Sequence, residues 1–554
     1  MARTVSVGAQ DFEYIISNDC FYVDKTGFIK EWWDNKDKVT LITRPRRFGK
    51  TLNMNMLERF FSVKFKEQGE IFEKFDIWRE EEYRKLQGRY PVIFLSFAGV
   101  KENDYEGAVY RICDIFQELY IKNYFLLDSD ILTDSEKKIF ERLASGIDAR
   151  DAVTALQKLS DYLFRYYGKK TLILLDEYDT PLQEAYAGGY WEKLVYFTKS
   201  LFNNTFKTNQ YLERAVMTGI TRVSKESLFS DLNNLKIITT TSDKYASCFG
   251  FTEEEVFAAM DEFGMTNKAD VKKWYDGFTI GNLKGIYNPW SIINFLDEGK
   301  LKTYWANTSS NELVSSLLKK AGKNIKMQFE ELLKYHSIKS KIDEEIVFNL
   351  LDKNENAIWS LLLASGYLKV KSIDGDIYEL ELTNYEVAKM FENMIDNWFG
   401  ESYGDYNDFI KSLLNENVEE MNEYMNQIAE IMFSSFDGGK KPSARTAPER
   451  FYHGFVLGLL VDLNGWYEVT SNRESGFGRY DVMLKPLNQK DNAIIIEFKI
   501  FNPKKEISLE ETVQAALKQI KEKEYEQTLV CQGIGKERIR KYGFAFEGKK
   551  VLIG

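Results

Sequence analysis

The feature that most constrains the fold is a short basic stretch near the start of the chain, which ends in Gly49-Lys50-Thr51. The apolar run Val39–Ile42 precedes it, and apolar residues four positions apart follow it at Leu52, Met56 and Phe60. Apolar residues at this spacing share one face of a helix. A strand, a short loop with Gly-Lys-Thr and then a helix is the arrangement of a phosphate-binding loop. The stretch therefore predicts an α/β domain of the P-loop NTPase type, with a parallel sheet covered by helices.

The expected roles in this loop follow from its chemistry. Backbone N–H groups and the helix N-terminus would hold phosphate oxygens, Lys50 would contact the β and γ phosphates of ATP, and Thr51 would ligate Mg²⁺. Arg44 stands where the usual pattern has its first glycine, so that a basic turn opening an ordinary helix is the alternative interpretation of this stretch alone. The predicted nucleotide-binding residues of the loop are Arg46, Arg47, Phe48, Gly49, Lys50 and Thr51.

A second predicted strand carries acidic residues that a nucleotide site needs. The apolar residues Leu172–Leu175 are followed by Asp176 and Glu177. Ligands bind at the carboxyl ends of strands in open α/β sheets, where Asp176 would hold Mg²⁺ and Glu177 would polarise the attacking water. Such a strand is usually structural when it occurs alone. Its occurrence together with a phosphate loop, in a pattern of alternating strands and helices, favours nucleotide binding.

A third predicted strand, Arg214–Ile220, contains the polar residue Thr218 close to its end. Thr218 would sense the γ-phosphate, and Arg222 would stabilise its charge. The alternative is a strand end followed by a surface arginine. Further along, the aromatic, turn-rich segments Trp274–Phe278 and Tyr287–Ile292 are predicted to pack against the nucleotide domain and to take no part in its chemistry.

From about Asn311 to Phe436 the pattern is mainly helical. Within it, a helix from Ala357 that stops at Gly366 is followed by two strand candidates joined at Asp374-Gly375, which is a hairpin signal. A helix followed by a hairpin suggests a winged-helix-like lid. Because acidic residues in the hairpin oppose contact with DNA phosphates, packing is favoured over DNA reading for this module.

The C-terminal region carries a second set of chemically informative residues. A polar linker, Asp437–Pro448, precedes two predicted strands that contain Asp481 and the pair Glu497-x-Lys499. On neighbouring strands Asp481, Glu497 and the Phe498 carbonyl would hold Mg²⁺, while Lys499 would position or activate the hydrolytic water. Accessory roles are predicted for Glu449, Glu474, Gln519 and Tyr525.

A Glu-x-Lys pair on a strand also occurs as a simple ion pair, because alternate residues share one face. The alternative interpretation of the C-terminal region is therefore an inactive, structural form of the same fold. Metal-dependent phosphodiester chemistry is favoured because a flexible acidic loop precedes Asp481 and the predicted helix Thr512–Glu522 presents Gln519.

Composition limits the remaining classes. The chain has 554 residues, four cysteines and two histidines, with no C-x-x-C pair, so that a zinc site or a disulfide framework is not expected. No apolar run approaches the ~20 residues that span a membrane, and a cytoplasmic location is predicted. The net charge of −11 argues against a surface generally coated by nucleic acid, but the segment from Lys440 onward is net positive and favours a polyanion contact there.

Four stretches together resemble the predicted AAA-ATPase-like family: Tyr22–Thr26, Arg44–Thr51, Leu175–Pro181 and Tyr287–Trp290. Members commonly carry a C-terminal domain of the PD-(D/E)XK nuclease superfamily, which Asp481, Glu497 and Lys499 resemble. The resemblance covers nearly the whole chain. In that family the loop begins Arg-Pro-Arg-Arg where ordinary phosphate loops have glycine, whereas Tyr480 stands where the broader nuclease pattern has proline.

The resemblance implies a bacterial, cytoplasmic ATPase and nuclease. The expected domains are an AAA-ATPase-like P-loop domain at 1–300, a helical, winged-helix-like lid at 301–436 and a restriction-endonuclease-like α/β domain at 437–554. The expected cofactors are ATP and Mg²⁺, with Mn²⁺ as an alternative in the nuclease, and the expected partner is DNA or RNA. The competing hypothesis is a nucleotide-switched interaction protein whose C-terminal fold binds without cutting. In a ring of self-associated chains, Arg46, Arg47 and Arg222 would act on a neighbour's nucleotide; otherwise they would clamp their own.

Overall fold

The computed structural model describes residues 3–222, 228–306, 314–315, 317–318, 323–343, 356–400, 406–433, 456, 460, 463 and 466–554, the last with gaps at 472–473, 476–477, 480, 489 and 548–549. The chain divides into two compact units, Met1–Phe391 and Glu392–Gly554, which are described separately. The domain boundaries predicted at residues 300 and 436 stay a prediction.

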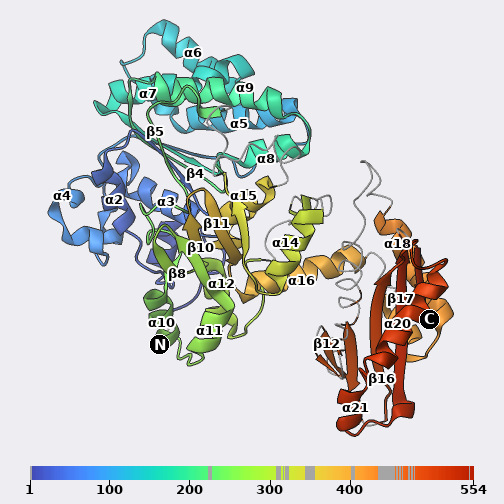
Figure 1. The fold of residues 1–554 in the computed structure, drawn as a ribbon. Coiled ribbons are helices and arrows are strands. Elements are labelled where there is room, and N and C mark those ends of the chain that lie inside the picture. The colour runs from blue at the N-terminus through green and yellow to red at the C-terminus, as the bar shows by residue number, and fades with distance from the viewer. Residues whose placement is uncertain are drawn as a thin grey trace. The chain divides into compact units, whose positions relative to one another are not determined.

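A five-stranded sheet forms the centre of the first unit (Figure 1). The strands are β1 (Val39–Thr43), β2 (Val92–Ser96), β3 (Thr171–Asp176), β4 (Leu212–Gly219) and β5 (Leu235–Ile238). They run parallel in the order β2-β3-β4-β1-β5, so that the ends of β3, β4 and β1 lie side by side. The α/β fold predicted from the alternating pattern is confirmed.

Helices cover both faces of this sheet, because side chains of alternate strand residues point to opposite faces. The main helices of this part are α1 (Phe12–Ser17), α2 (Gly27–Asn35), α3 (Lys50–Phe61), α4 (Glu81–Arg84), α5 (Tyr105–Lys122), α6 (Asp134–Ser145), α7 (Ala149–Tyr167), α8 (Thr180–Ala187) and α9 (Trp191–Phe202). Val39 and Leu41 of β1 join the apolar core that α5, α6, α7 and α9 form on one face (Figure 1). Short helical turns lie at Val63–Phe65, Gly69–Phe72, Asp76–Arg79, Tyr124–Asp128 and Asn203–Lys207.

A small antiparallel sheet and three helices follow β5. They are β6 (Phe251–Thr252), α10 (Glu253–Glu262), α11 (Lys268–Tyr275), β7 (Asp276–Ile280), β8 (Leu283–Tyr287) and α12 (Pro289–Glu298). Their buried core also contains Phe21 from the N-terminal segment. The segment before α2 is therefore packed against a part of the chain more than two hundred residues away.

The end of the first unit has the helix, strand, helix and hairpin order of a winged helix. It comprises α14 (Lys323–Leu333), β9 (Ile338–Lys341), α15 (Ala357–Ala364), β10 (Leu368–Asp374), β11 (Ile377–Leu382) and α16 (Tyr385–Gly400), which continues into the second unit. Gly375, with φ 58°, supplies the predicted hairpin turn. At Gly366, φ is 85° and a Cβ atom would lie 2.7 Å from Cγ of Pro45, so that only glycine lets this module approach the phosphate loop.

The second unit is built on a mixed five-stranded sheet in the order β12-β15-β16-β17-β18. Its elements are α17 (Tyr406–Leu414), α18 (Val418–Phe433), β12 (Tyr467–Ser471), β13 (Glu474–Ser475), β14 (Gly478–Arg479), β15 (Val482–Pro486), β16 (Ala493–Ile500), α20 (Leu509–Glu522), α21 (Gln527–Cys531), a turn at Lys536–Arg538, β17 (Ile539–Glu547) and β18 (Lys550–Ile553). Among the described strands of this sheet, β16 and β17 pair in parallel and the other pairs are antiparallel. In the part of the chain that the structure describes, no helix is both long and apolar enough to cross a membrane.

Candidate functional site

The loop between β1 and α3 has the backbone of an anion site. Arg47 and Gly49 adopt positive φ angles of 61° and 81°, and α3 starts at Lys50. No side chain caps this helix at Gly49, so that its first N–H groups are available to an anion. A non-glycine residue in this conformation is uncommon and is typical of functional loops.

Lys50 lies on the inner side of the loop. Its side chain is 5% exposed, and Nζ donates to the carbonyl oxygens of Arg44 at 3.0 Å and Pro45 at 2.8 Å. Burial lowers the pKa of Lys50, which the nearby carboxylates of Glu177 and Asp176 partly oppose. The ammonium group is therefore positioned by the backbone of the loop that it is expected to serve.

Asp176 brings three predicted residues together at the end of β3. Its two carboxylate oxygens accept hydrogen bonds from Thr51 Oγ1, at 2.7 Å, and from Thr218 Oγ1. Asp176 is 1% exposed, and burial raises its pKa, while the two hydroxyl bonds lower it. The predicted magnesium ligands and the predicted sensor thus form one hydrogen-bonded cluster.

Glu177 follows Asp176 with a positive φ of 51°, a second uncommon backbone conformation at this site. Its N–H donates to Thr218 Oγ1 at 3.3 Å, and its carboxylate accepts from Thr180 Oγ1 at 3.2 Å. Unlike Asp176, Glu177 lines the large cavity beside the loop. It is therefore placed where a general base or water-positioning group is needed.

Tyr178 and Asp179 support the site through contacts that the sequence interpretation did not include. Asp179 Oδ2 accepts from the N–H groups of Ile220 and Thr221, at 3.0 and 2.8 Å, while Tyr178 donates to the Thr221 carbonyl at 2.8 Å. A Cβ atom on Gly219 would lie 2.6 Å from both side chains. These contacts fix the chain that follows Thr218 to the end of β3. In the sequence, their position directly after Asp176-Glu177 is the signal that could have identified them.

The arginines of the loop behave differently from one another. Arg44 is fully buried and donates to the carbonyl oxygens of Thr43 and Thr239 at 2.9 and 2.8 Å. The guanidinium of Arg44 therefore supports the backbone behind the loop. Burial lowers its pKa to about 10. Arg46 and Arg47 are exposed and line the cavity.

Two other predicted residues of this site differ in their relation to the cavity. Phe48 belongs to the cavity lining but is 1% exposed, and its ring packs edge-on against Phe278 at 4.9 Å between ring centroids. Arg222 lines a separate small cavity with Thr43 and Thr239. The role of Arg222 toward a γ-phosphate stays a prediction.

The cavity beside the loop has a volume of about 600 Å³, which is within the usual range of ligand sites. Its walls include residues 46–53 of the loop and α3, together with Glu177 and Trp290. The guanidinium carbon of Arg47 lies 4.3 Å from the ring centroid of Trp290, and Asn288 donates to the Arg46 carbonyl at 3.2 Å. Within the Tyr287–Ile292 segment, which was predicted only to pack, Pro289 and Trp290 thus belong to the wall of this cavity.

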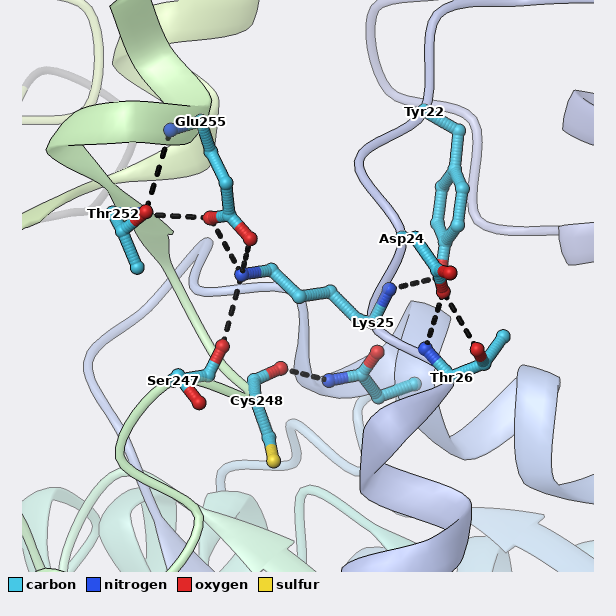
Figure 2. Close-up of polar contacts among 9 residues, drawn as sticks. Tyr22, Asp24, Lys25, Thr26, Ser247, Cys248, Thr252 and Glu255 are labelled. Carbon is cyan, nitrogen blue, oxygen red and sulfur yellow. Dashed lines mark hydrogen bonds and ion pairs between the residues drawn. The ribbon is translucent and has the colours of Figure 1, made fainter. Parts of the chain in front are cut away.

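The N-terminal segment is fixed beside the same cavity by an ion pair. Figure 2 shows the Lys25 ammonium between the Glu255 carboxylate, at 2.7 Å, and the Ser247 carbonyl, at 2.9 Å. Asp24 turns the other way and accepts from the N–H and hydroxyl of Thr26 at 2.8 and 2.7 Å (Figure 2). No local pattern predicts a pair between Lys25 and Glu255, because they are 230 residues apart.

The second predicted site lies on the hairpin β15–β16. Asp481 precedes β15, and its Oδ2 accepts from the Phe498 N–H at 2.8 Å, which places this acid beside the Glu497–Phe498 backbone. Glu497 is 3% exposed, whereas Asp481 and Lys499 are half-buried. The structure therefore brings the three predicted catalytic positions to one region of the sheet.

Gln519 of α20 joins these groups. It accepts from Lys499 Nζ at 2.7 Å and donates to Glu497 Oε1 and, at 3.1 Å, to the Tyr525 hydroxyl. Tyr525 is buried, and burial raises its pKa. The predicted accessory residues Gln519 and Tyr525 are thus in contact with the catalytic candidates. Glu449 lies outside the described residues, and of Glu474 the structure describes only the backbone, in β13.

The donor groups fit a divalent cation at both sites. At the first, the Thr51 hydroxyl and the Asp176 carboxylate meet at 2.7 Å; at the second, Asp481 is hydrogen-bonded to the backbone that carries Glu497 and the Phe498 carbonyl. Oxygen ligands of these kinds are preferred by Mg²⁺. No group of three or more His, Cys, Asp or Glu side chains suited to a metal occurs within the described residues.

Comparisons with known proteins agree with this division of the chain. Residues 6–229 match the family model described as "Predicted AAA-ATPase", and residues 447–554 match that of the PD-(D/E)XK nuclease superfamily. The chain is also 24% identical over 319 residues to a protein of Azotobacter chroococcum mcd 1 described as "Uncharacterized protein in vnfD 5'region". That match covers 57% of this chain and 56% of the relative, so that the chain spans about half the length of the curated relative it matches.

Proposed function

We propose that this chain, in which a predicted AAA-ATPase domain precedes a PD-(D/E)XK nuclease superfamily domain, hydrolyses ATP and uses its nucleotide state to control cleavage of DNA or RNA. Domains of these two kinds generally use a nucleotide and a divalent metal. The observation that carries the nucleotide half is the cluster in which Asp176 accepts from both Thr51 and Thr218 beside the phosphate loop.

In the proposed ATPase reaction, the loop N–H groups and Lys50 bind the phosphates, and Thr51 with Asp176 holds Mg²⁺. The bound cation would neutralise charge on the β and γ phosphates. Glu177 orients the attacking water and accepts its proton, since its carboxylate lines the cavity. Thr218 reports on the γ-phosphate end because it touches both Asp176 and the Glu177 N–H.

In the proposed nuclease reaction, Asp481, Glu497 and the Phe498 carbonyl hold the divalent cation, Mg²⁺ or Mn²⁺. When bound, that cation would supply Lewis-acid activation of the scissile phosphate. Lys499 positions the hydrolytic water, and Gln519 orients Lys499 through a 2.7 Å hydrogen bond. The support for this half is the contact between Asp481 and the Phe498 N–H, which places the two acids together.

A second candidate function is a nucleotide-switched protein whose C-terminal fold binds nucleic acid or another partner without cutting. One observation favours it: within the described residues, no group of three or more His, Cys, Asp or Glu side chains at the second site could hold a metal ion. Binding of Mn²⁺ that depends on Asp481 and Glu497, measured by calorimetry, separates the two functions, because the non-cutting protein does not require it.

The test of the main proposal is a cleavage assay with the full chain, ATP, Mg²⁺ and a panel of DNA and RNA substrates. The matched variants are Lys50→Ala and Lys499→Ala. The proposal expects cleavage by the native chain, none by Lys499→Ala and altered nucleotide dependence in Lys50→Ala. No cleavage by the native chain, or equal cleavage by Lys499→Ala, would contradict the proposed nuclease activity.

Location in the cytoplasm of a bacterium and nucleotide-driven self-association are further parts of the proposal. The mass of the protein, measured with and without ATP, tests the self-association.

A further inference from the structure

Apart from residues 46–53 and Ile220, the lining of the cavity beside the phosphate loop falls into two sets. One set comes from the segments that follow β2 and β3 and is polar. Its members include Lys101, Glu177, Thr180, Gln183 and Glu184. The other set comes from the N-terminal segment and from residues 248–293, and it is mainly apolar and aromatic. We call its core the base compartment, formed by Ile15, Tyr22, Val23, Phe251, Trp290 and Ile293.

The base compartment carries little charge. Among the described lining residues of this second set, Lys25 is the one charged side chain. It is 8% exposed, and its ammonium lies against the Glu255 carboxylate and the Ser247 carbonyl (Figure 2). Because this ion pair neutralises Lys25, the compartment does not favour a phosphate. An uncharged, flat, apolar group fits its chemistry better.

Trp290 lies where the compartment meets the phosphate loop. Its ring is stacked with the Arg47 guanidinium at 4.3 Å, and Asn288 caps α12 by accepting from the Trp290 N–H at 2.9 Å. Asn288 also donates to the Arg46 carbonyl at 3.2 Å. The aromatic ring is thus fixed to the same backbone that is expected to bind phosphates. A charged site and an aromatic site joined in this way match the two ends of a nucleotide.

We propose that the base compartment binds the base of the nucleotide, with Trp290 as the aromatic wall nearest the phosphates. This inference rests on the proposed nucleotide function and names the part of the site that recognises the nucleoside. It gives the Tyr287–Trp290 segment and the segment before α2 a role in selecting a nucleotide over a simple polyphosphate. Stacking of a base on an aromatic side chain is sequence-tolerant, so that hydrogen bonding does not have to supply most of the affinity.

The test compares ATP with inorganic tripolyphosphate, which shares the phosphate chain but lacks a nucleoside. Their affinities for the full chain are measured by calorimetry with Mg²⁺ in the native protein, Trp290→Ala and Trp290→Phe. We expect Trp290→Ala to weaken the affinity for ATP at least about fivefold, in line with the loss of one base stack. The affinity for tripolyphosphate should fall less than about twofold. Trp290→Phe keeps an aromatic face and should restore most of the ATP affinity.

Matched variants keep the test decisive. Ile293→Asn alters the compartment without touching the Arg47 stack, and it serves if Trp290→Ala does not fold. Trp466→Ala removes an exposed tryptophan, 67% accessible, from the other unit and controls for loss of a tryptophan. The proposal that the base compartment binds the base is overturned if Trp290→Ala and Ile293→Asn lose ATP affinity and tripolyphosphate affinity equally. It is also overturned if neither affinity falls in these variants. If the native chain binds neither compound, the proposed nucleotide function falls as well, so that the two failures are distinguishable.

Discussion

The two candidate sites hold their acidic residues in different ways. Asp176 is 1% exposed and receives hydroxyl groups from α3 and β4, so that the nucleotide site is continuous with the core of its unit. At the second site Glu497 is also buried, but Asp481 and Lys499 are half-buried and are held by one backbone N–H and one glutamine. We therefore expect most substitutions at the first site to change stability together with activity, and substitutions of Asp481 and Lys499 to change activity alone.

Substitution of Glu177 is expected to have the largest effect on activity, because this residue lines the cavity and lies outside the buried cluster around Asp176. Glu177→Gln keeps the size of the side chain but removes the base. ATP hydrolysis should fall by about 10² to 10³, with ATP affinity changed less than about threefold. Single-turnover hydrolysis and equilibrium binding measure the two quantities. Glu192→Gln, exposed on α9, is the control, and hydrolysis retained in Glu177→Gln would assign the base elsewhere.

Arg44 tests the structural side of the nucleotide site. Its guanidinium donates to buried carbonyl oxygens behind the loop, and Arg44→Ala leaves them without these donors. The free energy of unfolding should fall by about 2–4 kcal/mol. Chemical denaturation of Arg44→Ala and of the exposed Arg46→Ala gives the comparison, and Arg46→Ala should stay within about 0.5 kcal/mol of the native chain. Equal stability of the two variants contradicts a supporting role for Arg44.

Gln519 provides the corresponding test at the second site. Gln519→Ala removes the contact to Lys499 and the one to Glu497, and cleavage should fall by about 10- to 100-fold, the usual effect of losing a group that orients metal-site residues. The melting temperature should change little, because the site is partly open. Gln514→Ala, exposed on the same helix, is the matched control. A large loss of stability in Gln519→Ala would show that the second site is built like the first.

The sequence was informative wherever function follows from local order. The positions of Asp176 and Thr218 were predicted because each lies close to the end of an apolar strand, and parallel strands bring such ends together. Lys50 was predicted because it opens the helix that follows the loop after β1. The hairpin at Gly375 and the pair Glu497 and Lys499 of β16 were also predicted from local order, because turn residues and the alternation of strand side chains act over a few positions.

The remaining parts depend on contacts between distant segments, which no local pattern encodes. The charge of Arg44 is visible in the sequence, whereas its carbonyl partner at Thr239 is not. The Tyr287–Ile292 segment was interpreted as packing because aromatic residues near a turn are common, and the contacts of Asn288 and Trp290 with Arg46 and Arg47 emerge only from the fold. Sequence order therefore located the chemistry but not the groups that support it.

Glu386 tests whether burial raises the pKa of carboxylates in the first unit, as it does at Asp176 and Asp179. Its carboxylate is fully buried in α16 and accepts from Ser291 Oγ and from the N–H groups of Tyr304 and Trp305, at 2.7, 2.6 and 2.7 Å. Burial raises the pKa of Glu386 from 4.5 to about 6, although these donors oppose the shift.

A carboxyl whose pKa is higher in the folded than in the unfolded state contributes stability that is fully present below pH 4.5 and is lost as the pH rises through 6. The free energy of unfolding of the native chain, measured relative to Glu386→Gln, should therefore fall by about 2 kcal/mol over this window. Urea denaturation at several pH values measures it, with the exposed Glu254→Gln as the control for loss of a negative charge. A difference that is flat with pH would mean that the donors from Ser291, Tyr304 and Trp305 fully offset burial.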